Sequence, residues 1–119
     1  MHRGKKITGG KYIKARKKKL YENTGQKKTV KLGEDKRKSK KVRGGNLKTF
    51  LLRAKIVNVQ TDGKTKKTEI KNVIETPSNR FLARQNVITK GTIVETEMGK
   101  VRITNRPTQE GTLNGILVK

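Results

Sequence analysis

From residue 47 onward, apolar residues recur in short runs that favour β-strands, with turn-forming residues between them. The stretch Leu47–Val59 is rich in β-forming residues and partly alternates between apolar and polar positions. Lys66–Glu75 is a second such run. Thr61-Asp62-Gly63-Lys64 separates the two, and Asp-Gly at this position predicts a β-hairpin because both residues tolerate a positive φ.

The rest of the chain continues the same pattern with shorter runs. They are Phe81–Ala83, Val87–Thr89, Thr92–Glu97, Lys100–Thr104 and Leu113–Val118. Met98-Gly99 predicts a second hairpin, between the third and fourth of these runs. Five to seven short strands at this spacing predict an all-β domain, a small barrel or sandwich, with Phe50 and Phe81 in its core. No window shows a sustained helical stripe.

Residues 1–46 have a different pattern, with only 10 apolar residues. They carry 18 Lys and Arg against 3 acidic residues. Such a segment cannot bury enough apolar surface to offset its ordering entropy, roughly 1–2 kcal/mol per residue. We therefore expect a basic, extended arm over residues 1–46 and a β-domain over residues 47–119, with the boundary near Gly44-Gly45. Removing residues 1–43 is expected to leave that β-domain folded and to weaken its binding to a partner.

Composition narrows the partner to a polyanion. The chain has 119 residues and a net charge of +23, which allows one domain and favours nucleic acid as partner. It contains no cysteine, which excludes disulfides, Cys-ligated zinc and thiol nucleophiles. Its longest strictly apolar runs have three residues, and the N-terminus lacks the apolar stretch of a signal peptide. We expect an intracellular protein with no membrane association.

The residues offer little for catalysis. His2, the only histidine, stands at the chain terminus, far from any partner in sequence. Gly63-Lys64-Thr65 resembles the end of a phosphate-binding loop, but the glycine needed five residues earlier is Asn58. Glu95 and Glu97 are the only carboxylate pair worth testing, and charge balancing on a solvent-facing strand explains them better. We expect no enzyme, no cofactor, no metal and no small-molecule substrate.

Two basic clusters carry the positive signal. Lys14–Lys19 has five cations in six residues, and Lys36–Arg43 has six in eight. Each phosphate neutralised by such side chains releases counterions, which gives tight, salt-dependent binding to nucleic acid. A solvated tail, a polybasic membrane segment or a localisation signal would show similar runs. The clusters lack the apolar face that a membrane segment needs.

Glycine pairs and tyrosines add detail to the arm. Gly9-Gly10 and Gly44-Gly45 each stand beside a cation, where the missing Cβ lets the backbone approach a phosphate closely; each pair could instead be a hinge. Asn46 is suited to a base edge or a 2′-hydroxyl. Tyr12 and Tyr21 are suited to stacking on unpaired bases, although docking onto the barrel is an alternative.

The chain resembles the S-eight-e family of ribosomal proteins, an archaeal and eukaryotic family of the small subunit. The resemblance rests on Lys5–Gly10 with the basic run Arg16–Lys19, on Val42–Asn46 (VRGGN), and on Asn86–Glu97 through Arg106-Pro107. It implies a six-stranded barrel with an rRNA-bound N-terminal extension. The length implies an archaeal-type cytoplasmic ribosome, where the partners would be small-subunit rRNA and neighbouring ribosomal proteins.

The predicted function is that of a structural constituent of the small subunit, in which the arm neutralises phosphates and the barrel docks. The candidate rRNA-binding residues are Arg3, Lys5, Lys6, Thr8, Gly9, Gly10, Lys11, Tyr12, Lys14, Arg16, Lys17, Lys18, Lys19, Tyr21, Lys27, Lys28, Lys36, Arg37, Lys38, Lys40, Lys41, Arg43, Gly44, Gly45, Asn46, Lys48, Arg80, Arg84, Arg102 and Arg106. A DNA-compacting chromatin-like protein and an RNA-associated translation or assembly factor are the alternatives.

Overall fold

The computed structural model describes residues 4–13 and 15–118, and in this part of the chain nine strands form two sheets. The sheets are a four-stranded one in the order β2-β3-β1-β6 and a closed barrel, β4-β5-β7-β8-β9. The elements are a 3-10 turn, η1 (Leu20–Glu22), then β1 (Val30–Leu32), β2 (Lys36–Lys41), β3 (Leu47–Ala54), β4 (Ile56–Thr61), β5 (Lys64–Glu75), α1 (Arg80–Arg84), β6 (Val87–Ile88), β7 (Ile93–Thr96), β8 (Gly99–Ile103) and β9 (Asn114–Leu117).

The barrel confirms the all-β class and both predicted hairpins. Asp62 (φ 42°) and Gly63 (φ 80°) form the turn between β4 and β5, the conformation that a two-residue hairpin loop requires. Gly99 (φ 119°) lies at the second turn, between β7 and β8. The last strand, β9, pairs antiparallel with β8 and parallel with β4, which closes the barrel. The closed barrel has five strands, whereas six were expected.

The second sheet is built partly from residues that sequence patterning assigned to an arm without regular structure. Strand β1 runs parallel to β3 and antiparallel to β6, so it joins two segments far apart in the sequence. Strand β2 pairs with β3 as a long hairpin at the edge of the sheet. Residues 30–32 and 36–41 are therefore part of the folded body. Their pairing partners compensate for the scarcity of apolar residues of their own.

One hydrophobic cluster joins the two sheets. Val30 of β1 and Leu51 of β3 are buried with Val59, Val94 and Val101 of the barrel. Because the sheet and the barrel share this core, the long β-rich run expected over residues 47–59 divides into two strands, which serve different sheets. The division falls at residue 55, between β3 and β4.

Lys55 fixes the joint between the sheet and the barrel. Its backbone N–H donates to Asp35 Oδ1 (2.8 Å), and its carbonyl oxygen accepts from the Ile70 N–H (2.8 Å). Its ammonium group lies 2.8 Å from Glu69 Oε2, and this bond raises the pKa of Lys55. These three bonds at one residue hold the direction of the β2–β3 hairpin relative to the barrel.

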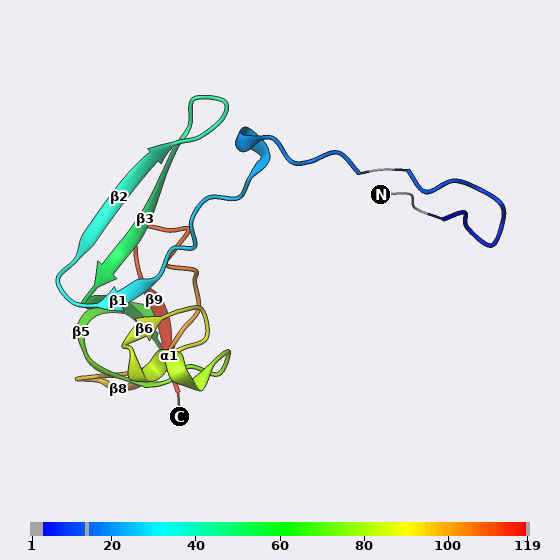
Figure 1. Ribbon diagram of the computed structural model, residues 1–119. Helices are drawn as coiled ribbons and strands as arrows, with labels where there is room; N and C mark the ends of the chain where they lie inside the picture. Colours follow the sequence, from blue (N-terminus) through cyan, green and yellow to red (C-terminus); the bar gives the residue numbers. More distant parts are fainter. Residues whose placement is uncertain (1–3, 14, 119) are drawn as a thin grey trace.

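The segment before β1 extends away from the body, as Figure 1 shows. The molecule measures 65 × 35 × 28 Å and its radius of gyration is 20.7 Å, against about 13–14 Å for a compact chain of this length. In residues 4–13 and 15–29, regular local structure is limited to a turn closed by the Lys5–Lys11 bridge and to η1. We refer to residues 4–29 as the N-terminal segment.

Phe81 is the clearest local error of the sequence analysis. It was assigned to a strand and to the barrel core, whereas it lies on α1 and is 55% exposed. Asn79 caps this helix, since its side chain accepts from the Phe81 N–H at 3.0 Å. Phe50 is buried as expected, but on β3 of the open sheet and not in the barrel.

Candidate nucleic-acid interface

The β2–β3 hairpin concentrates positive charge on a fixed scaffold. All six residues of β2 (KRKSKK) are exposed, and β2 is an edge strand. Residues 36–53 contain eight Lys and Arg and no acidic residue. Consecutive strand residues point to opposite faces, so the cations of β2 extend to both sides of the hairpin.

The hairpin register sets positive side chains against each other. Lys40 lies opposite Lys48 in the antiparallel pairing, and like charges at such positions are destabilising. Lys38 lies opposite Phe50. Because Lys38 and Lys40 are two residues apart on one strand, they share a face and stand about 7 Å apart. A polyanion lying along this face would relieve the repulsion between the two strands.

A groove runs between that face and the end of the N-terminal segment. Gly25–Thr29 lines one side of it, and Lys38, Lys40 and Phe50 line the other. The Lys28 ammonium group lies 3.5 Å from the centroid of the Phe50 ring, a close cation–π contact. Lys28 thereby holds the last residues of the N-terminal segment against the hairpin, which brings three predicted contact residues, Lys28, Lys38 and Lys40, to one place.

Both glycine pairs lie in turns. Gly44 (φ 87°) and Gly45 (φ 82°) form the hairpin tip, which is closed by bonds from the Val42 N–H to the Asn46 carbonyl (2.8 Å) and from the Gly45 N–H to the Val42 carbonyl (3.3 Å). The expected hinge at a domain boundary is thus the end of a hairpin. Gly9 (φ 81°) serves a similar turn, in which its N–H donates to the Lys6 carbonyl (2.9 Å).

The basic run around η1 is partly neutralised within the chain. The Arg16 guanidinium donates to both carboxylate oxygens of Glu22, with an Nη1–Oε2 distance of 2.9 Å, and the Lys19 N–H donates to Glu22 Oε2 at 3.0 Å. The Arg16 bond and, after it, the Lys19 bond lower the pKa of Glu22. The Arg43 guanidinium donates to the Tyr21 carbonyl (3.3 Å), so the hairpin tip contacts η1.

The remaining predicted contacts lie apart from the hairpin. Arg80 and Arg84 are exposed on α1, Arg102 is exposed on β8, and Arg106 follows β8 in a turn. Arg3 and Lys14 lie outside the described residues. The other predicted residues of the N-terminal segment are exposed: Lys5, Lys6, Thr8, Gly10, Lys11, Tyr12, Lys17, Lys18, Lys19, Tyr21 and Lys27.

Arg53 and Phe81 are exposed residues that were not among the predicted contacts. Arg53, exposed on β3, lies opposite Lys36 at the base of the hairpin and extends its positive surface. Phe81 was excluded because it was expected in the core. The sequence feature that could have indicated its exposed position is Asn79 after Pro77, because Asn is a common N-cap and marks the start of a helical turn.

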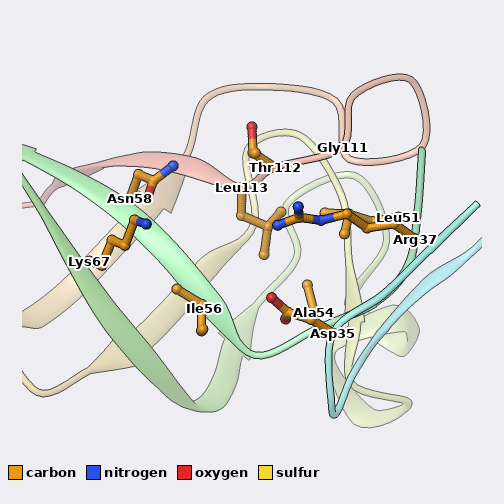
Figure 2. A pocket seen from close by; sticks show the side chains of 10 residues that line it. All are labelled: Asp35, Arg37, Leu51, Ala54, Ile56, Asn58, Lys67, Gly111, Thr112 and Leu113. Carbon is orange, nitrogen blue, oxygen red and sulfur yellow. The ribbon is translucent and has the colours of Figure 1, made fainter. Parts of the chain in front are cut away.

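A hollow of about 280 Å³ lies between the hairpin base and the barrel (Figure 2). Leu51 and Leu113 give it apolar walls, and Arg37 and Lys67 stand on opposite sides of it. Its one carboxylate, that of Asp35, accepts the Lys55 N–H in the joint described above. The hollow thus adds two cations to the positive surface and holds no pair of carboxylates.

The described residues give no sign of other chemistry. They contain no group of three His, Cys, Asp or Glu side chains placed to hold a metal ion. Glu95 lies opposite Lys100 across β7 and β8, as expected for charges that balance on a solvent-facing strand. Of the helices in residues 4–13 and 15–118, none is long and apolar enough to cross a membrane.

These features define a class: small, basic β-barrel proteins with a polycationic hairpin and an extended, basic N-terminal segment. Within it, the chain belongs to the ribosomal protein S8e family, whose profile matches residues 2–118. The chain is 52% identical to "Small ribosomal subunit protein eS8" of Staphylothermus marinus, covering 97% of this chain and 92% of the relative. It is 50% identical to the protein of the same name from Nanoarchaeum equitans (95% and 91%) and 36% identical to that from Methanosarcina barkeri (97% and 94%).

Proposed function

We propose that this protein is a structural component of the small ribosomal subunit that binds its rRNA. The main support for rRNA binding is the β2–β3 hairpin, which has eight Lys and Arg and no acidic residue and lies at the edge of the sheet. The second support is that the chain belongs to a ribosomal protein family. The relatives are named as small-subunit proteins, which supports an archaeal-type ribosome in the cytoplasm as its location. The role is structural and not catalytic.

The proposed mechanism is the neutralisation of closely spaced phosphates. Lys and Arg of residues 1–46 displace counterions from rRNA, and the gain grows with each phosphate contacted. Because the backbone of Lys38 and Lys40 is held in a strand, little backbone entropy is lost when these two residues bind. The N-terminal segment, by contrast, must lose conformational freedom to bind, and so adapts to the RNA surface.

We assign residues 1–46 as the rRNA-binding portion, of which β1 and β2 belong structurally to the folded body, and residues 47–119 as the docking portion of that body, with Arg80, Arg84, Arg102 and Arg106 as contacts on it. The bonds at Lys55 support this assignment, because they set the direction of the basic hairpin relative to the barrel. Neighbouring proteins of the small subunit are the other partners that we propose for this chain. No small molecule is part of this function.

Sedimentation of the tagged protein from a lysate of its own host tests the proposal. The lysate is run through a sucrose gradient at a salt concentration high enough to remove adventitious binders. Recovery in equimolar amount with the small subunit is expected. Recovery at the top of the gradient would contradict the proposal and favour an assembly factor that leaves the ribosome. Recovery with chromosomal DNA would favour a chromatin-like function.

A further inference from the structure

Phe81 is an exposed aromatic ring on an otherwise polar and basic surface. It is 55% exposed, although the chain has few aromatic residues and no tryptophan. Phe50 is buried, and the two tyrosines lie in the N-terminal segment. Phe81 is therefore the only aromatic side chain that the folded body offers to a ligand. A single exposed hydrophobic residue is common on proteins, so its surroundings must decide whether it has a role.

Two arginines flank this ring. The Arg80 guanidinium lies 5.5 Å and the Arg84 guanidinium 5.9 Å from the ring centroid of Phe81. Residues 76–94 contain no acidic residue, and neither arginine belongs to the ion pairs found in the described part of the chain, Arg16–Glu22 and Lys55–Glu69. Both guanidinium groups are free to bind phosphate.

The backbone holds this group in place. The Asn79 side chain caps the first turn of α1, and the Leu82 N–H donates to the Asn79 carbonyl at 3.0 Å. After the helix, the Asn86 carbonyl accepts from the Leu32 N–H (2.9 Å), which ties α1 to β1. Ala83 packs against the core, so the outward position of Phe81 follows from the helix being fixed on its other side. A rigid aromatic platform loses little entropy on binding.

This group lies on the side of the molecule away from the hairpin. Helix α1 precedes β6, which is the sheet edge opposite β2. Figure 1 shows α1 at the barrel end of the molecule and the tip of the β2–β3 hairpin at the other end. An RNA segment bound along β2 would therefore not reach α1 without passing around the body.

We propose that Arg80, Phe81 and Arg84 form a second RNA-binding site, in which the Phe81 ring stacks on an unpaired nucleobase and the two guanidinium groups bind the adjacent phosphates. The charge and the exposed ring fit unpaired RNA, because aromatic side chains and arginine together bind single-stranded bases. With the hairpin, this site lets one protein hold two rRNA segments. The inference rests on the proposed function and adds a second contact surface to it.

Binding of full-length variants to the small-subunit rRNA of the same organism, measured by filter binding over a range of salt concentrations, tests this site. Phe81→Leu, which keeps an apolar side chain but removes the ring, is expected to weaken binding roughly 5- to 150-fold without changing the salt slope. Phe81→Tyr should bind like the parent chain. The double variant Arg80→Gln, Arg84→Gln should reduce the slope of log K against log salt by about 1.4–1.8.

Val118→Ala serves as the control, because Val118 is a comparably exposed apolar residue (40%) that follows β9 and belongs to neither proposed site. Its rRNA affinity should match that of the parent chain, and thermal melting should show every variant folded. Equal binding by Phe81→Leu and the parent chain would overturn the second site and favour an acidic protein neighbour for this surface. Failure of the parent chain itself to bind rRNA would instead overturn the proposed function, and this site with it.

Discussion

At the scale of single residues, Glu22 stabilises the local shape of the N-terminal segment around η1. It is the only acidic residue before Glu34, and it binds both the Arg16 side chain and the Lys19 backbone N–H. These bonds form around the carboxylate, so they lower the pKa of Glu22. The interaction is complete above the ordinary pKa of a glutamate and disappears as the pH falls through the lowered value.

We predict that Arg16→Gln raises the pKa of Glu22 toward its ordinary value, because the first of the bonds that favour the charged form is removed. Carbon-13 NMR of the side-chain carboxyl group, followed from pH 2 to pH 7, measures the change. Lys17→Gln, which removes a neighbouring cation that makes no bond to Glu22, is the control and should leave the titration nearly unchanged. Equal Glu22 titration in the parent chain and in Arg16→Gln would contradict the prediction.

Gly115 makes the barrel closure sensitive to a single methyl group. It lies on β9, and an added Cβ would stand 2.5 Å from Val101 Cγ1 and 3.0 Å from the Arg102 carbonyl oxygen. We predict that Gly115→Ala lowers the free energy of unfolding by about 1–3 kcal/mol through overpacking. Urea denaturation measures it. Gly25→Ala is the matched control, because a Cβ there meets nothing within 4 Å; equal stability of the two variants would refute the packing argument.

At the scale of elements, the β2–β3 hairpin depends on its tip. Gly44 and Gly45 both have φ near +85°, where a residue with a Cβ costs roughly 1–2 kcal/mol. We predict that the double variant Gly44→Val, Gly45→Val loosens the hairpin and leaves the barrel folded. Amide hydrogen exchange should accelerate at Lys38, Lys40 and Lys48, whose N–H groups bond across the hairpin, while the thermal midpoint of the barrel changes little.

The same variant links the hairpin to rRNA binding. Cations on a loosened hairpin must be ordered again on binding, so rRNA affinity should fall together with hairpin protection. The variant with Asn at both positions is the control, since Asn tolerates a positive φ better than Val. Weaker binding with unchanged hairpin exchange would mean that the backbone itself contacts phosphate at the tip. Loss of barrel stability would mean that the tip supports the whole fold.

The elements differ in how far the sequence could predict them. Asp62-Gly63 and Met98-Gly99 marked two hairpins because turn chemistry is local. Val30–Leu32 could not be recognised as a strand, because its partners lie in β3 and β6, more than 20 residues away. Nor could Lys36–Lys41, since β2 has no apolar alternation and becomes a strand by pairing with β3. From composition alone, both segments were assigned to an extended arm.

The candidate site was predictable in charge but not in geometry. Counting cations located the hairpin residues, whereas the groove that joins Lys28 to Phe50 depends on tertiary packing. Phe81 was missed because patterning treats an aromatic residue as a core residue by default. Its exposure follows from the short helix, whose other side faces the core.

At the scale of the whole molecule, the boundary between the free segment and the body can be tested by truncation. The free part ends before the Lys28–Phe50 contact, and the body begins with Val30, which is fully buried. A chain lacking residues 1–24 keeps that contact and the core. It loses nine Lys and Arg, which contribute to rRNA affinity through counterion release.

We predict that removal of residues 1–24 leaves the thermal midpoint nearly unchanged, weakens rRNA binding roughly 100-fold or more at moderate salt, and lowers the salt slope by about 0.7–0.9 for each phosphate that is no longer neutralised. Removal of residues 1–43 should instead unfold the protein, because β3 and β6 lose β1 and the core loses Val30. Circular dichroism and filter binding compare the two. A well-folded 1–43 deletion would show that the barrel is independent of the open sheet, and that residues 30–43 serve rRNA binding alone.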